Sequence, residues 1–196
     1  MVIPYIIYYI SVIVWLFPPL RQYRTKYFSF FLILALADPF SFIFYHLLTI
    51  YPIRIYLIIT FLLIVSVTYK NKSVRQIVLF AVILAGLVIT DFYLKAAYIY
   101  DLNIFLSGIL VFLFVKETIL SFNKNLTINL FYLILTLYEI SVVLKFLFNI
   151  YLTNKGIVYF YTTTAFEILI GIFFIFYNVL NSPNLKLFDE SRFTIK

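Results

Sequence analysis

The chain has 196 residues, of which 65% are hydrophobic and only 12% are charged, and its formal net charge is +7. Soluble domains carry about 25% charged residues, so this chain has too few polar side chains to coat a soluble core. The composition therefore predicts an integral membrane protein. Seven spans of about 20 residues would use most of the length and leave no room for a separate soluble domain.

The composition also excludes several chemistries. The chain has no cysteine, which excludes disulfides, thiolate catalysis and zinc–thiolate sites. The basic residues lie in short loops between apolar runs, where they contact lipid headgroups and set topology rather than bind nucleic acid. The expected partner is therefore the lipid bilayer.

Apolar runs predict seven helices, at residues 2–17, 27–50, 55–69, 77–94, 96–115, 128–152 and 157–180. Pro18 and Pro19 end the first run, and Asp38-Pro39 interrupts the second. The first run has no basic n-region and no small-residue cleavage site, so we expect it to be retained as a helix. Residues 1–180 are predicted to form one all-α transmembrane domain, and residues 181–196 a polar, mobile cytoplasmic tail.

The basic residues predict the orientation of these helices. If all seven cross, three basic residues fall on one side of the membrane, namely Arg54, Lys95 and Lys155. The other side receives eleven: Arg21, Arg24, Lys26, Lys70, Lys72, Arg75, Lys116, Lys124, Lys186, Arg192 and Lys196. The richer side is cytoplasmic by the positive-inside rule. The sequence thus predicts a multi-pass protein of the cytoplasmic membrane, with its N-terminus outside and its C-terminus inside.

An internal repeat is visible between two of the predicted helices. FLILALADPFS begins at Phe31, and YLILTLYEIS begins at Tyr132, which pairs Asp38 with Glu139. Apolar helices also match one another by composition alone, so chance similarity stays open as an alternative. A true duplication predicts three helices, a linking helix and three more, with the two halves parallel as in one class of transporters.

One segment has the pattern of a known motif. Residues 11–28, SVIVWLFPPLRQYRTKYF, resemble the PQ-loop motif of SWEET-type and related transporters, in which an apolar helix ends in Pro-Gln before a basic stretch with Tyr and Lys. Here the pair is Pro18-Pro19, and Gln22 is displaced. The position of a second copy, near Lys116, reads VKETILSFNKN and has no Pro-Gln. The resemblance implies a seven-helix transporter of small solutes.

Three carboxylates lie near the middle of predicted helices: Asp38, Glu139 and Glu167. A charge at bilayer depth costs about 2.5–3.5 kcal/mol on insertion scales, so each one needs a reason. Acids that face a shared cavity would suit proton coupling or the binding of a cationic ligand. The alternative is structural, with protonated acids bonding between helices or an acid pairing with a cation.

Lys145 and Thr163 complete the candidate set. Lys145 follows Glu139 by six residues, which puts the two side chains about 120° apart on a helix, so they are not an intrahelical pair. Lys145 could instead reach Glu167 or extend to the interface. Thr163 and its two threonine neighbours could donate to Glu167, to a ligand or to their own helix. The predicted ligand- or proton-binding residues are Asp38, Glu139, Glu167, Lys145 and Thr163.

Two functions are compatible with these features. His46 is the only histidine, so no metal site is expected, and no catalytic motif or cofactor signature is present, so we expect no enzyme. The first function is a small-solute or proton-coupled transporter with an acidic cavity at the membrane midplane. The alternative is a non-catalytic sensor or membrane-complex subunit that acts through a partner membrane or signalling protein. The sequence leaves open a homo-oligomer.

Overall fold

The computed structural model describes residues 3–68, 74–94, 96–151 and 156–186, and these form helices apart from loops and one two-stranded sheet. The helices are α1 (Ile3–Trp15), α2 (Pro18–Arg21), α3 (Phe28–Leu48), α4 (Pro52–Thr68), α5 (Val74–Tyr93), α6 (Ala96–Asn125), α7 (Leu130–Tyr151) and α8 (Gly156–Phe176). The strands are β1 (Thr127–Asn129) and β2 (Asn184–Lys186). The all-α class predicted from the sequence is confirmed for the described part of the chain.

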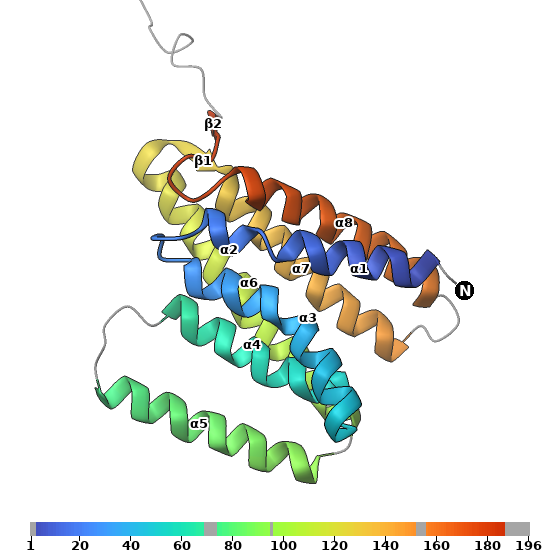
Figure 1. The fold of residues 1–196 in the computed structure, drawn as a ribbon. Helices are drawn as coiled ribbons and strands as arrows, with labels where there is room; N and C mark the ends of the chain where they lie inside the picture. The colour runs from blue at the N-terminus through green and yellow to red at the C-terminus, as the bar shows by residue number, and fades with distance from the viewer. Residues whose placement is uncertain (1–2, 69–73, 95, 152–155, 187–196) are drawn as a thin grey trace, which may run out of the picture.

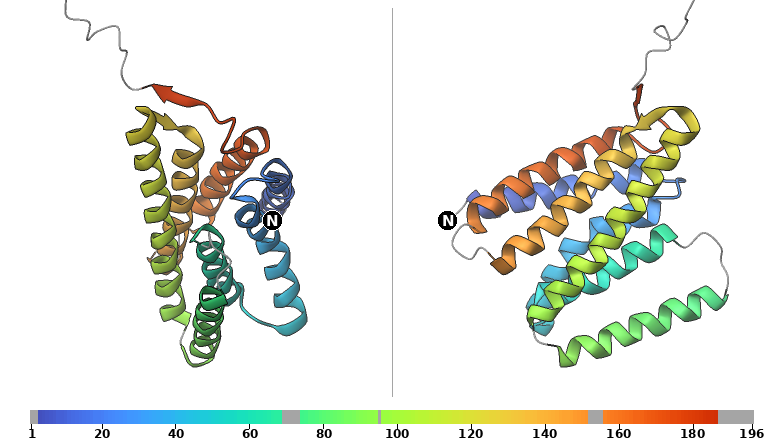
Figure 2. Two further views of the ribbon diagram at one scale, coloured as in Figure 1. Left: turned by 90° about the vertical axis from the view of Figure 1, so that its left-hand side faces the viewer. Right: turned by 180° about the vertical axis from the view of Figure 1, so that it is seen from behind.

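Six of the long helices form a closed ring (Figures 1 and 2). Each packs against the next in the order α1, α3, α4, α6, α7, α8, and α8 packs against α1. Helix α5 lies outside this ring, beside α4 (Figure 1). Helices α1 and α6 begin at the same end of the bundle, as do α3 and α7, and α4 and α8 (Figure 1). The ring therefore consists of two parallel three-helix halves, and α5 connects them.

In the part of the chain that the structure describes, three helices are long and apolar enough to cross a membrane: Phe28–Leu48, Tyr98–Lys124 and Leu130–Phe148. Only 28%, 22% and 28% of these windows is buried inside the protein, and each helix carries exposed large apolar side chains, such as Phe42, Phe112 and Leu137. The other long helices are apolar over shorter stretches, at Ile6–Arg21, Pro52–Thr68, Val78–Ile89 and Tyr161–Phe176. Outward-facing apolar surface on this scale is characteristic of a protein in contact with lipid.

Several helix ends differ from the prediction. Helix α6 continues to Asn125, so the predicted connection after residue 115 is helical. Lys and Glu are good helix formers, and a helix can extend past the apolar region into a polar one. Pro18 and Pro19 do end α1, but they also open the short helix α2, because the first turn of a helix tolerates proline. Pro52 begins α4 for the same reason.

Helix α2 is attached to the end of α8 by two side chains. Gln22, which is fully buried, donates from Nε2 to the carbonyl of Tyr177 at 2.9 Å. Arg21 donates from Nε to the carbonyl of Phe176 at 3.1 Å. The last carbonyls of a helix have no partner within it, and these two donors satisfy them. The displaced glutamine of the PQ-like segment thus joins the end of α2 to the end of the last helix, α8.

A short antiparallel sheet holds part of the predicted tail. Strand β2 pairs with β1, with Ile128 opposite Leu185. Residues 184–186 are therefore fixed against the turn between α6 and α7, and residues 187–196 lie outside the described part. The sequence did not indicate this sheet, because three residues are too few for a strand pattern.

The aromatic part of the hydrophobic core lies at the α2 end of the ring. We call it the aromatic layer, and its rings are Trp15, Tyr27, Phe30, Phe31, Phe114, Phe131 and Phe174. The centroids of Phe31 and Phe174 are 4.8 Å apart, and those of Phe131 and Phe174 are 5.2 Å apart. Because five of these phenylalanines have no exposed surface, the layer fills the ring at this end.

The described basic residues lie mainly at this same end. Arg21, Arg24 and Lys26 lie beside α2, Lys124 lies in the last turn of α6, and Lys186 ends β2. Lys116 lies in the C-terminal half of α6, and Arg75 is the second residue of α5. Of the other basic residues of the topology prediction, Lys70, Lys72, Lys95, Lys155, Arg192 and Lys196 lie outside the described residues. Arg54 lies in the first turn of α4, at the opposite end.

Candidate functional site

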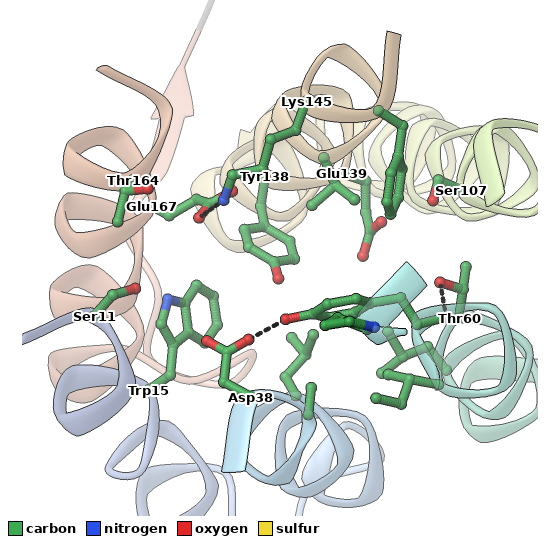
Figure 3. Close-up of a pocket in the computed structure, with 18 of the residues that line it drawn as sticks. Ser11, Trp15, Asp38, Thr60, Ser107, Tyr138, Glu139, Lys145, Thr164 and Glu167 are labelled. Carbon is green, nitrogen blue, oxygen red and sulfur yellow. Dashed lines mark hydrogen bonds and ion pairs between the residues drawn. The ribbon is translucent and has the colours of Figure 1, made fainter. Parts of the chain in front are cut away.

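A cavity of about 310 Å³ lies inside the ring, and all six ring helices line it (Figure 3). Its lining includes Tyr8 from α1, Asp38 from α3, Tyr56 from α4, Ser107 from α6 and Glu139 from α7. Helix α8 contributes Tyr159, Thr164 and Glu167, whereas none of the described side chains of α5 takes part. The cavity therefore lies between the two halves, and four of the five residues predicted from the sequence line it: Asp38, Glu139, Lys145 and Glu167.

Asp38 projects into the cavity from the middle of α3. It accepts a hydrogen bond from the hydroxyl of Tyr56 on α4 (Figure 3). Pro39 follows it and has no amide hydrogen to bond the carbonyl of Ala35, one turn earlier. The carboxylate is thus held by a neutral donor. The carbonyl of Ala35 lacks its usual hydrogen bond within the helix.

Glu139 lies opposite, on α7, with 2% of its surface exposed. Its Oε1 atom has no hydrogen-bond partner among the described residues. In Figure 3 the carboxylate points into the hollow, toward the side from which Asp38 projects. A buried acceptor without a partner carries a desolvation cost of about 1–3 kcal/mol, which a ligand, a water or a proton would relieve.

Lys145 and Glu167 form an ion pair across α7 and α8. The distance from Nζ to Oε2 is 2.6 Å, and the side chains are 28% and 9% exposed. Lys145 therefore reaches Glu167, one of the two positions that the sequence left open for it. This pair neutralises one of the three acids and leaves Asp38 and Glu139 without a cationic partner among the described residues.

Two neighbouring threonines of α8 make different contacts. Thr163 donates from its hydroxyl to the carbonyl of Tyr159 in its own helix at 2.9 Å and does not line the cavity. Thr164 does line it, is 3% exposed, and has no hydrogen-bond partner among the described residues. Ser107 on α6 is likewise fully buried, lines the cavity and lacks a partner in the described part of the chain. The neighbour of the predicted threonine, and a serine that sequence reasoning missed, therefore contribute the free hydroxyls.

Aromatic rings form much of the wall, and sequence reasoning did not select them. They are Tyr8, Trp15, Tyr56, Tyr100, Tyr138, Phe146 and Tyr159. The ring of Tyr138 lies 4.8 Å from that of Trp15, between centroids. On α1, Tyr8, Ser11 and Trp15 recur at helical spacing, which is a usable signal. That signal was obscured because 22% of the chain is aromatic.

Two other charged features lie away from the cavity. Lys26 and Glu117 form an ion pair of 2.8 Å at the α2 end, where Lys26 is 47% exposed. Burial by itself lowers the pKa of Lys26, but the hydrogen bond to Glu117 and the nearby charges outweigh it and raise the pKa overall. His46 is exposed and packs on the ring of Phe42, and the described residues contain no group of three metal-binding side chains.

Comparison of the chain with family models, with curated proteins and with solved structures finds no match.

Proposed function

We propose that the chain is a multi-pass protein of the cytoplasmic membrane with seven spans, its N-terminus outside and its C-terminus inside. The outward-facing apolar surfaces of the long helices support contact with lipid. The alternating direction of the helices is compatible with seven crossings (Figure 1). The described basic residues near α2 and β2 favour the cytoplasm for that end of the bundle.

Within this topology, the function that the site supports best is transport of a small solute, coupled to protons. The observation that carries this proposal is the placement of acids from both halves around one cavity. Asp38 comes from α3 and Glu139 from α7, which occupy equivalent places in the two parallel halves. Transporters built from repeats bind their substrates near the midplane at the repeat interface. The resemblance of residues 11–28 to the PQ-loop motif is in line with the same function.

The aromatic layer gives this proposal a direction. The cavity extends from the layer toward the end where the chain starts, since it contains Tyr8, Tyr100 and Tyr159 from the early turns of their helices. The layer closes the ring on the cytoplasmic side, so the conformation corresponds to a site separated from the cytoplasm. Alternating access would require the two halves to rock and the layer to open.

The test is proton flux in proteoliposomes that enclose a pH-sensitive dye, with a membrane potential imposed. We expect the wild type to conduct or exchange protons, and Glu139→Gln to reduce the flux about tenfold or more, because it removes a group that binds the proton. Asp101→Asn is the matched control, since Asp101 is an exposed acid on α6 outside the cavity. Full flux with Glu139→Gln would remove Glu139 from the coupling role.

A sensor or complex subunit that acts through a partner protein is the second candidate. The five fully buried phenylalanines of the aromatic layer favour it, because a receptor needs a closed floor under its ligand rather than a gate. Native mass spectrometry of the protein extracted from its host membrane separates the two. A stoichiometric second protein, together with no flux, would favour the sensor. The chain alone or with copies of itself would favour the transporter.

A further inference from the structure

The charges around the cavity are unbalanced. Among the described residues, its lining holds three carboxylates and a single ammonium group, and that ammonium, on Lys145, is engaged by Glu167 at 2.6 Å. Asp38 is bonded only to a neutral hydroxyl in the part of the chain that the structure describes, and Glu139 has an oxygen with no partner there. An anionic solute would meet two unneutralised acids in a low dielectric, which is strongly unfavourable. The charge pattern therefore favours a cation.

The remaining polar atoms also indicate a ligand. Ser107 and Thr164 are 0% and 3% exposed, line the cavity, and have hydroxyls without partners in the described residues. Together with Oε1 of Glu139 they come from α6, α7 and α8, so the unmet hydrogen bonds lie along the side of the hollow opposite Asp38 (Figure 3). Buried polar groups are nearly always bonded, and those that are not call for an occupant of the space they face.

The walls distinguish an organic cation from a metal ion. Rings of Trp15 and Tyr138 face the hollow between the acids (Figure 3). Tyr56 also lines the cavity and bonds Asp38. The faces of aromatic rings attract ammonium groups, and rings that surround a cation are the usual way to bind quaternary ammonium compounds. A divalent metal would need several oxygen ligands close together, and the described residues contain no group of three candidate ligands. A cavity of about 310 Å³ is at the small end of ligand sites, which span about 300–1,000 Å³.

We propose that this cavity binds a small organic cation, an amine or quaternary ammonium compound, with its charge between Asp38 and Glu139 and its apolar part against Trp15 and Tyr138. The inference rests on the proposed function, since the cation would be the solute that is transported. The inference adds the chemical class of that solute. The acids alone would indicate only a positive charge, and the rings alone only an apolar group.

The test compares charged probes with neutral molecules of the same shape. Radiolabelled choline and 3,3-dimethyl-1-butanol form one pair, and benzylamine and benzyl alcohol form the other. Binding is measured by equilibrium dialysis against the full chain in lipid nanodiscs, with empty nanodiscs as the blank. We expect at least one cation to bind saturably and about tenfold or more tighter than its neutral partner, which corresponds to one charge interaction of modest strength. Equal affinities, or no saturable binding by either cation, would overturn the proposal.

Trp15 locates the bound probe. It is the only tryptophan of the chain and lines the cavity, so the fluorescence of the chain in detergent micelles, which contain no scaffold protein, reports on this site alone. Asp38→Asn and Glu139→Gln should each weaken binding about tenfold or more, whereas Asp101→Asn should bind like the wild type. Binding to both cavity variants with unchanged affinity would place the cation elsewhere and refute the site.

The comparison of charged and neutral probes needs only the wild-type chain, so it remains decisive even where a variant does not fold. It also separates this inference from the proposed function. Cation binding without any flux would retain the site and remove the transporter. Proton flux without cation binding would retain the transporter and remove the organic cation.

Discussion

The contact between Lys145 and Glu167 shows how the bundle tolerates charge in its interior. The ammonium and the carboxylate lie 2.6 Å apart on adjacent helices, and neither side chain is more than 28% exposed. Removing one partner of such a pair leaves a charge without compensation in a poorly solvated place, whereas removing both does not. The pair is therefore expected to matter more through the cost of breaking it than through its net attraction.

A double-mutant cycle measures this difference. Lys145→Met alone and Glu167→Gln alone should each destabilise the protein, and the double variant should be more stable than the sum predicts, with a coupling of about 1–3 kcal/mol. The measurement is reversible unfolding in mixed micelles, followed by circular dichroism. Additive effects of the two substitutions would show that the pair does not act as a unit.

The packing of α1 on α8 depends on one residue without a side chain. A Cβ atom at Gly171 would lie 2.7 Å from Cγ1 of Val14 and 3.4 Å from Cε2 of Trp15. Small residues let helix backbones approach closely in membrane proteins, and this contact places Trp15 at the wall of the cavity. The position is therefore predicted to accept no larger residue without a shift of α1.

Gly171→Ala tests this contact, and Gly108 provides the matched control. A Cβ atom at Gly108, on α6, would meet nothing within 4 Å. We expect Gly171→Ala to lower the free energy of unfolding by about 1–3 kcal/mol through overpacking and to shift the emission of Trp15. Gly108→Ala should leave both unchanged or stabilise the helix slightly. Equal stability of the two variants would mean that α1 moves aside at no cost.

The elements also show what the sequence determines and what it does not. Long apolar runs indicate helices directly, because each backbone group must be bonded within its own segment in lipid. The cost of a buried charge likewise singled out Asp38, Glu139 and Glu167, all of which line the cavity. The sequence does not show which face of a helix points inward when every face of that helix is apolar. The aromatic wall and the hydroxyl of Tyr56 on Asp38 therefore emerged only from the packing.

At the scale of the whole molecule, the helices of the ring are arranged as they would be in two structurally equivalent halves. Exchanging α1, α3 and α4 for α6, α7 and α8 reproduces the same order of neighbours, including the contacts of α1 with α8 and of α6 with α4. The exchange also places Asp38 and Glu139 in corresponding helices. Helix α5 has no counterpart in it. Because α5 packs against α4 outside the ring, the alternation of sides depends on whether this helix crosses the membrane.

Single-cysteine labelling decides this, since the chain has no native cysteine. Thr49, which ends α3, and Lys124, in the last turn of α6, are both exposed, and α4, α5 and α6 lie between them. Three crossings put the two positions on opposite sides. Thr49→Cys should thus react with an impermeant maleimide on intact cells, and Lys124→Cys only after permeabilisation. Helix α5 has 20 residues and a length of about 30 Å, which matches the hydrocarbon core. Labelling of both positions from outside would mean that an even number of these helices cross the membrane. The simplest arrangement of that kind has α5 lying at the membrane surface. Labelling with the two sides reversed would keep three crossings and invert the orientation, so the aromatic layer would then close the external end of the cavity.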